Sequence, residues 1–251
     1  MLRQLILFLA VAAVGCISAV EPVWKNPELN QQNREPRRAG YFAYESRSLA
    51  DRGDKKASSR YLSMEGKWKF CFVRDHADRP RDFFKPGYDD SSWTEFPVPG
   101  LFELNGYGDR IYKNVGYAWA TTFKNNPPYV SETDNYTGSY RRTFVLPESW
   151  KGSEVYFHVG SATSNLMLWV NGKYVGYSED SKVAAEFNIT KYLRPGRNLI
   201  AMQVMRWCDG SYLEDQDFWR FTGIAREVYL YSRPKTHIRD IRIAADLTRE
   251  S

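Results

Sequence analysis

The chain has 251 residues, of which 43% are hydrophobic and 16% are aromatic. This length suits one domain with some additional chain, and the apolar content is enough to fill a packed core, which excludes a disordered protein. The formal net charge is only +5, and the basic residues between Arg34 and Arg60 are interleaved with acidic ones, which argues against a nucleic-acid partner.

The first twenty residues have the form of a secretory signal. Arg3 precedes an apolar run from Leu5 to Val14 that is too short to cross a bilayer comfortably. Two cleavage sites fit, because residues 13–16 resemble a bacterial lipobox with Cys16 as the lipid-bearing residue, whereas residues 17–19 suit an ordinary signal peptidase. We favour the lipobox, and we therefore expect an exported protein, in the periplasm or as an outer-membrane lipoprotein of a bacterium.

Residues 21–60 follow the leader as a polar segment of mixed charge, and we expect an irregular lead-in. From Tyr61 onward the chain breaks into short apolar runs bounded by Gly, Pro, Asn and Asp, which is typical of many strands and few helices. Several runs alternate between apolar and polar residues, as half-buried antiparallel strands do. They cover residues 67–73, 139–146, 154–160, 198–207 and 226–232.

The clearest local signal lies in residues 166–177. Two alternating runs flank Asn171-Gly172, a pair that favours the positive φ angles of a tight hairpin turn. Because no helical period is sustained, the pattern predicts an all-β protein, with a jelly-roll β-sandwich over residues 61–234. Residues 237–247 indicate one more strand, either the start of a second domain over residues 235–251 or a C-terminal edge strand.

Familiar metal-binding and nucleophile motifs are missing from the sequence. The histidines His76, His158 and His237 are isolated, and there is no Cys-x-x-Cys, no His-Glu-x-x-His, no Ser-centred elbow and no phosphate-binding Gly loop. His158 lies within a predicted strand, and we expect a packed strand residue there and not a base. Cys71 and Cys208 lack the neighbours of a catalytic thiol, and whether they form a single disulfide stays open.

Residues 206–223, the acidic segment, combine carboxylates with aromatic rings. Carboxylates accept hydrogen bonds from sugar hydroxyls, aromatic faces bind the apolar side of a pyranose, and oxygen clusters suit hard cations. The segment could therefore be a cation site, a sugar-binding lip or an acid/base centre. Composition alone favours a polar loop whose rings pack on the sandwich while its acids face water or pair with Arg206 and Arg220. The acids are Asp209, Glu214, Asp215 and Asp217, and the rings are Tyr212, Phe218 and Trp219.

A second candidate segment, residues 105–119, is rich in Gly, Asn and Tyr and has no strand period. Its Asn114 offers both a hydrogen-bond donor and an acceptor, which suits a ligand that bears hydroxyl groups. The residues alone favour the alternative that Asn114 caps its own turn.

Six segments occur along the chain in a recognisable order. They are YLSMEGKWKFCFV, FFKPGYDDSSWTEFPVPG, NGYGDRIYKNVGY, NNPPYVSETDNYTGSYRRTF, LMLWVNGKYVGYSEDSKVAAEFNIT and RWCDGSYLEDQDFWRFTGI. In this order they resemble the N-terminal sugar-binding domain of large bacterial β-galactosidases of glycoside hydrolase family 2. The resemblance runs from Trp24 to Thr236, and the last motif is highly specific.

The resemblance implies a multidomain enzyme: a jelly-roll sugar-binding domain, an immunoglobulin-like domain that would begin at residues 235–251, and a TIM barrel. It implies that Asp217 contacts galactosyl hydroxyls and helps to hold a monovalent cation, usually sodium, and that Asn114 binds a galactose hydroxyl. Retaining hydrolysis of terminal β-D-galactosides uses two glutamates about 5 Å apart. These glutamates, and a magnesium site, would lie in the barrel, so the resemblance places no catalytic residue in this chain.

Three hypotheses follow. The favoured one is the N-terminal sugar-binding domain of an exported β-galactosidase, which would bind a β-galactoside together with its own downstream catalytic domain and be inactive alone. The second is a free-standing galactose-binding module without catalysis, and the third is a domain that has lost its ligand. In the favoured one Asp209, Glu214 and Asp215 fix the acidic segment, and Phe218 and Trp219 anchor it to the sandwich. A homo-oligomer is compatible with all three.

Overall fold

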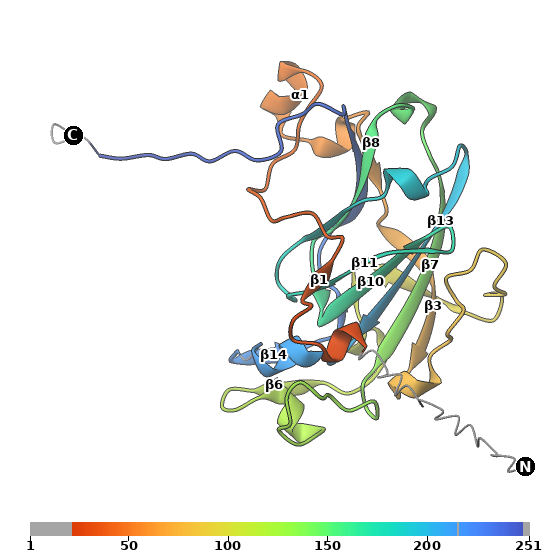
Figure 1. Ribbon diagram of the computed structural model, residues 1–251, viewed down its shortest axis with the longest axis vertical. Coiled ribbons are helices and arrows are strands. Elements are labelled where there is room, and N and C mark those ends of the chain that lie inside the picture. Colours follow the sequence, from red (N-terminus) through yellow and green to blue (C-terminus); the bar gives the residue numbers. More distant parts are fainter. Residues whose placement is uncertain (1–21, 215, 248–251) are drawn as a thin grey trace, which may run out of the picture.

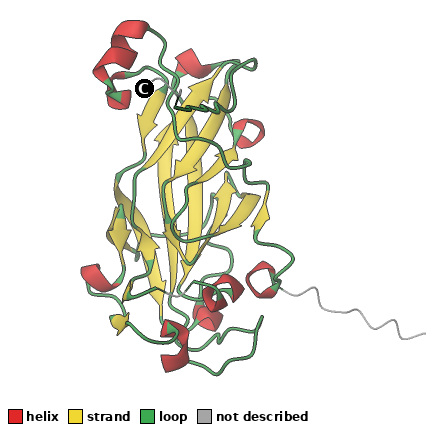
Figure 2. Cartoon of the chain, turned by 90° about the vertical axis from the view of Figure 1, so that its left-hand side faces the viewer, coloured by secondary structure: helices red, strands yellow, loops and turns green. Residues whose placement is uncertain are grey.

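The computed structural model describes residues 22–214 and 216–247. The predicted signal, residues 1–20, and the proposed lipid anchor at Cys16 lie outside the described residues. The described chain consists mainly of antiparallel strands in two facing sheets, with short helical turns at both ends (Figures 1 and 2). The predicted all-β fold, a jelly-roll β-sandwich, is confirmed.

Two sheets make up the sandwich within these residues. The larger has seven strands in the order β1 (Gln31–Gln32), β11 (Lys173–Glu179), β10 (Asn165–Val170), β13 (Arg197–Met205), β7 (Thr137–Val145), β3 (Gly66–Val73) and β4 (Thr94–Val98). The smaller has four in the order β12 (Ala185–Asn188), β8 (Glu154–Val159), β16 (Val228–Arg233) and β2 (Tyr61–Ser63). All neighbouring strands pair antiparallel.

Two small sheets and several short helical turns decorate the sandwich. One small sheet joins β5 (Gly100–Leu101), β15 (Gly223–Ile224) and β9 (Ala162–Thr163), and the other joins β14 (Phe218–Arg220) to β6 (Ile111–Lys113). Within residues 22–214 and 216–247 the one α-helix is α1 (Arg47–Arg52). The single-turn 3-10 helices are η1 (Val23–Lys25), η2 (Lys55–Ala57), η3 (His76–Asp78), η4 (Glu103–Asn105), η5 (Ala118–Thr121), η6 (Glu148–Trp150), η7 (Thr190–Tyr192) and η8 (Asp209–Tyr212).

The core lies between the two sheets because alternate strand residues point inward. Leu168 on β10 and Ile200 on β13 meet Phe157 on β8 and Leu230 on β16, and each of these side chains is fully buried. Burial of one such side chain stabilises the fold by about 1.5–3 kcal/mol. The alternation that the sequence shows is therefore the pattern of this core, and the five predicted runs form β3, β7, β8, β13 and β16 with ends within two residues of the predicted ones.

The predicted hairpin turn is also confirmed. Val170 at the end of β10 pairs with Lys173 at the start of β11. Between them Asn171 has a φ of 51° and Gly172 a φ of 83°. Positive φ at both central residues defines the type I′ turn that Asn-Gly favours.

The lead-in is more ordered than predicted. Its β1 extends the larger sheet next to β11, and α1 forms a short helix within it. The backbone N–H of Leu49 donates to Ser46 Oγ at 3.3 Å, and Gly53 ends the helix with a φ of 66°. An exposed helix of this length buries no residue, so it leaves no apolar period in the sequence.

Residues 237–247 do not form a strand in the described chain, so the prediction of a C-terminal edge strand is wrong. The segment leaves the sandwich as extended chain (Figure 1). Ile243 and Leu247 are each 86% exposed, because no sheet edge receives them. The alternative, the start of a second domain over residues 235–251, stays a prediction.

Cys71 is half-buried and Cys208 is buried, and both are free thiols, so the two cysteines are not bridged.

No helix between residues 22 and 214 or between 216 and 247 combines the length and apolar character that a membrane span needs.

The hairpin turn can be tested by replacing Gly172 with Ala. A Cβ at Gly172 would sit 2.9 Å from Pro86 Cδ on a backbone with a φ of +83°. We expect the free energy of unfolding, measured by urea titration, to fall by about 1–2 kcal/mol. Gly87→Ala is the matched control, because a Cβ there meets nothing within 4 Å and the φ is not in the positive region. Equal stability of the two variants would contradict the turn assignment.

Candidate functional site

The structure brings the two predicted ligand residues together on the small sheet of β6 and β14, which we call the ribbon. Ile111, Tyr112 and Lys113 pair antiparallel with Arg220, Trp219 and Phe218, in that order. Asn114 follows β6 directly and Asp217 precedes β14 directly. Asn114 and Asp217 therefore lie across from one another at one end of the ribbon, although they come from distant parts of the sequence.

One side of the ribbon, its free face, carries the candidate residues. Side chains alternate along a strand, so Tyr112 and Asn114 share a face with Asp217 and Trp219. Tyr112 is 50% exposed and Trp219 is 47% exposed. Asn114 and Asp217 are exposed as well. The free face thus presents an amide, a carboxylate and two rings to the outside of the domain.

The opposite side of the ribbon holds it against the sandwich. Ile111 packs on the cluster that contains Trp119 and Trp207. The guanidinium of Arg220 lies 5.3 Å from the ring centroid of Trp207, and its Nη1 lies 3.3 Å from Glu214 Oε2. The alternation along two short strands therefore separates an anchoring face from the free face.

Asp217 has a neutral partner. The hydroxyl of Tyr112 donates a hydrogen bond to Asp217 Oδ1 at 2.8 Å. This hydrogen bond, together with the charge of the carboxylate, raises the pKa of the Tyr112 phenol. Among the described residues, no Lys, Arg or His forms an ion pair with Asp217. The second carboxylate oxygen has no side-chain donor within the described residues, and a carboxylate oxygen can accept a hydrogen bond or bind a hard cation.

Of the other described acids of the acidic segment, Glu214 has structural partners and Asp209 is buried. Glu214 accepts hydrogen bonds from Ser181 N at 2.7 Å and from Ser181 Oγ at 2.5 Å, so it fixes the segment as expected. Asp209 is buried, with 8% of its surface exposed. Asp215 lies outside the described residues.

The expectation that Phe218 and Trp219 anchor the segment is wrong. Phe218 is 40% exposed, and Lys182 Nζ lies 4.2 Å from its ring centroid. Tyr212 serves as the anchor, because its ring packs 4.9 Å from that of Trp119. Pairing with β6 turns Trp219 outward, and a sequence pattern does not show that a ring lies on a two-stranded ribbon.

A buried carboxyl pair that the sequence did not indicate lies beside Cys208. Ligand atoms of Glu179, Cys208 and Asp209 all lie within 4.8 Å of one another. Burial, followed by the proximity of Asp209, raises the pKa of Glu179 to about 8, against 4.5 for the ordinary group. The hydroxyl of Tyr177 donates to Glu179 Oε1 at 2.5 Å. Because both carboxyls are buried, the pair does not form an acid/base centre open to a substrate.

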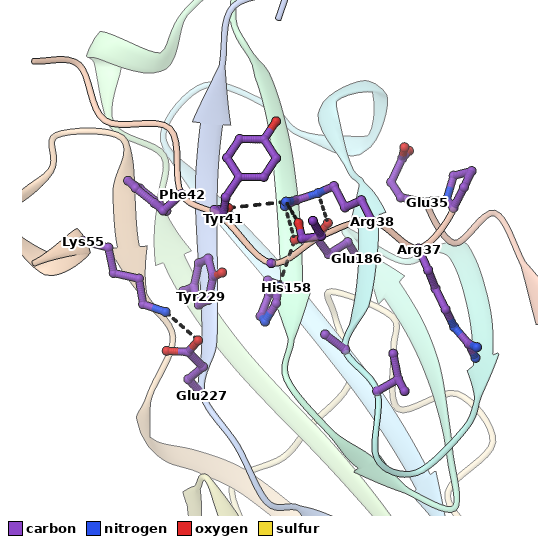
Figure 3. Close-up of a pocket in the computed structure, with 15 residues that line it drawn as sticks. Glu35, Arg37, Arg38, Tyr41, Phe42, Lys55, His158, Glu186, Glu227 and Tyr229 are labelled. Carbon is purple, nitrogen blue, oxygen red and sulfur yellow. Dashed lines mark hydrogen bonds and ion pairs between the residues drawn. The ribbon is translucent and has the colours of Figure 1, made fainter. Parts of the chain in front are cut away.

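A cavity of about 300 Å³ lies between the lead-in and the smaller sheet (Figure 3). Arg38 from the lead-in donates to both carboxylate oxygens of Glu186, at 2.8 and 3.0 Å, and His158 Nδ1 lies 2.9 Å from Glu186 Oε1. Burial alone would raise the pKa of Glu186, but His158 and Arg38 hold it below its ordinary value. His158 also stacks on Tyr229 at 4.3 Å, as expected of a packed strand residue. Arg38 and His158 pair with Glu186, and Lys55 pairs with Glu227, so these charged lining groups already have partners. No predicted ligand residue lines the cavity.

Comparison with known proteins gives a consistent picture. Residues 61–234 match a family model described as "Glycosyl hydrolases family 2, sugar binding domain". A beta-galactosidase of Priestia megaterium is 42% identical over 227 residues, which is 90% of this chain and 22% of that protein. A beta-galactosidase of Halalkalibacterium halodurans is 38% identical over 217 residues, which is 86% of this chain and 21% of that protein. The chain thus spans about a fifth of the length of these relatives.

Solved structures agree on the fold. The crystal structure of a Bacteroides uniformis beta-glucuronidase matches 69% of this chain and 18% of that chain, with a TM-score of 0.52 and 24% identity. At this identity the likeness shows the fold alone.

The buried carboxyl pair predicts a pH dependence of stability. Folded Glu179 keeps its proton up to about pH 8, whereas the ordinary carboxyl loses it near 4.5. Between these values the folded chain binds more protons, so this group's contribution to stability is full below the lower value and is lost as pH rises through the window. Glu179→Gln removes the titration. The free energy of unfolding of the variant relative to wild type should therefore rise with pH, by up to about 1.4 kcal/mol per pH unit.

Urea titrations at several pH values across this window measure the effect. Glu148→Gln, at an exposed glutamate, is the control and should leave the pH dependence unchanged. Parallel pH curves for wild type and Glu179→Gln would contradict the proton held at Glu179.

Proposed function

Because the chain belongs to the sugar-binding domain family of glycoside hydrolase family 2, we propose that it is the N-terminal domain of a β-galactosidase. In this proposal the whole enzyme hydrolyses terminal β-D-galactosides with retention of configuration. The chain binds the galactosyl group through Asn114 and Asp217 and presents it to a catalytic domain that follows in the same polypeptide.

One observation supports the proposal: the register of the ribbon puts Asn114 and Asp217 across from one another at the end of its free face. A carboxylate accepts hydrogen bonds from adjacent hydroxyls, and an amide can both accept and donate, so the two groups suit a sugar. Their ribbon is fixed from behind by Ile111 and Arg220. A ligand that binds to such a prepared surface costs the protein little conformational freedom.

Asp217 also fits a monovalent cation such as sodium. Its carboxylate is exposed, and among the residues 22–214 and 216–247 it has a hydroxyl and no cationic side chain as a partner. When bound there, the cation would supply a positive charge toward which sugar hydroxyl oxygens can turn. One carboxylate does not complete such a site, so the remaining oxygen ligands would come from the following domain. We place the magnesium ion of the enzyme in that domain as well.

The described residues suit binding and not bond cleavage. Retaining hydrolysis needs two carboxyl groups about 5 Å apart at the substrate. Among the residues that the structure describes, the free face offers one carboxylate, Asp217, and the close pair Glu179 and Asp209 is buried. The proposed chemistry therefore belongs to the following domain.

A free-standing galactose-binding module is the less favoured alternative. The free face exposes Tyr112 and Trp219, and Ile243 and Leu247 of the outgoing segment are more exposed still. Apolar side chains gathered at two places suit contact with a further domain better than contact with water. The relatives named above, which are several times longer, support the same choice.

We further propose that the protein is exported, because residues 1–20 have the form of a secretory signal. Cell fractionation tests this proposal, and we expect the protein in the periplasm or the outer membrane. Labelling with a palmitate analogue distinguishes the two cleavage sites, since Cys16→Ser should abolish a label only if Cys16 is lipidated. Recovery of an uncleaved protein in the cytosol would contradict export.

If binding residues and catalytic residues lie in separate domains, activity should be present in the extended protein and absent from this chain alone. Purified residues 21–251 should not cleave a nitrophenyl β-D-galactoside, whereas the gene product extended in frame past Ser251 should cleave it. The measurement is release of nitrophenol at equal protein concentrations. A stop codon directly after Ser251, or turnover by the short chain that is lost on mutation of one of its own carboxylates, would overturn the proposal.

The ligand roles predict a weaker substrate affinity in two variants of the extended protein. Asp217→Asn replaces a charged acceptor with a neutral amide, and Asn114→Ala removes a hydrogen-bonding group, so we expect KM for a nitrophenyl galactoside to rise about 10- to 100-fold. Asp51→Asn, at an exposed carboxylate on α1, is the control. Unchanged kinetics in both variants would remove Asn114 and Asp217 from the site.

A further inference from the structure

Asp217 accepts a hydrogen bond from Tyr112. The two residues sit on the same face of the ribbon, since Tyr112 pairs with Trp219 and Asp217 lies two residues before Trp219. Diagonal neighbours of this kind are within reach of a long aromatic side chain. The hydroxyl of Tyr112 accordingly lies 2.8 Å from Asp217 Oδ1.

The ring of Tyr112 is itself held in place. Its centroid lies 5.5 Å from that of Trp219, and the ring of Trp219 in turn stacks at 5.8 Å on that of Phe221. The row of three rings restricts the directions in which the Tyr112 hydroxyl can point. A hydroxyl on a restrained ring orients a carboxylate better than a hydroxyl on a flexible side chain.

The contact has an electrostatic consequence. A Lys or Arg in the same place would neutralise Asp217 and compete with a bound cation, whereas a neutral phenol leaves the negative charge intact. The hydrogen bond occupies Oδ1. Within the described chain, no side chain donates to Oδ2 of Asp217. Oδ1 is therefore available to orient the carboxylate, while Oδ2 is left for a ligand.

We propose that Tyr112 is a positioning residue, whose hydroxyl fixes the Asp217 carboxylate in the orientation that binds the galactosyl group and its cation. This inference rests on the proposed function. The fold has little need of the hydroxyl, because Tyr112 is 50% exposed and its ring makes the contact with Trp219. Tyr112→Phe therefore removes the hydrogen bond and keeps the ring.

The test uses the extended protein and two readouts. Calorimetric titration with a non-hydrolysed thiogalactoside, in sodium buffer and in choline buffer, measures binding without turnover. We expect Tyr112→Phe to raise Kd about 5- to 20-fold in sodium buffer, near the lower end of what a hydrogen bond to a charged group contributes, because the pair is exposed to water. The difference between the two buffers should shrink. In steady-state kinetics KM should rise by a similar factor while kcat changes less than about threefold.

A double-mutant cycle distinguishes positioning from a structural role. If Tyr112 acts through Asp217, then Tyr112→Phe should change Kd less than about twofold in the Asp217→Asn background. Equal effects in both backgrounds would overturn the proposal. Tyr129→Phe is the matched control, because Tyr129 is 49% exposed and lies off the ribbon, and it should change neither Kd nor the effect of sodium. The melting temperature of each variant should match that of wild type.

The outcomes also separate this inference from the proposed function. If Asp217→Asn weakens thiogalactoside binding and Tyr112→Phe does not, the positioning role is wrong and the proposed function stands. If the wild-type extended protein binds no thiogalactoside, both are wrong.

Discussion

The free face depends on the burial of one guanidinium group beneath it. Arg220 is 6% exposed, and a buried charge is tolerated only where acceptors surround it. Its acceptors are Glu214 Oε2 at 3.3 Å, the carbonyl oxygen of Arg206 at 3.4 Å and Ser211 Oγ at 3.5 Å. These contacts fix β14 at a residue whose strand neighbour, Trp219, must then point away from the domain. The orientation of Asp217, two residues before Trp219, follows from the same anchor.

The sequence predicts the sandwich well and the ribbon poorly, for one physical reason. Strands such as β13 run for nine residues and are buried along almost their whole length, so their apolar pattern is long enough to be visible. The strands β6 and β14 have three residues each, too few for a period to be visible, and they pair between remote segments. Asn114 and Asp217 could therefore be named from the family motifs, while their meeting on one face needed the structure.

Buried charge is a second property that the sequence conceals. Glu179 ends a strand and Asp209 begins a 3-10 turn thirty residues later, and no pattern indicates that the two carboxyls lie close together. The lead-in hides a second buried pair. In the sequence Arg38 and Glu186 look like solvated residues, yet their side chains are each 11% exposed and their ion pair holds the lead-in against the smaller sheet. Removal of either Arg38 or Glu186 would leave the charge of the other buried without a partner. The lead-in therefore folds as part of the domain.

The ribbon suits a domain that would form one side, or wall, of a sugar site, with the following domain as the second wall. Two polar groups on an open ribbon leave most hydroxyls of a sugar in contact with water, so the affinity of the wall alone is low whatever its precision. Precision still matters, because a second wall adds its contacts at full strength only if the first holds the sugar in one place. A ribbon anchored from behind by Arg220 and Ile111, with Asp217 oriented by a restrained phenol as proposed, would supply that precision. Selectivity would then arise where the two walls meet, and the rigid wall would set the position of the sugar for both.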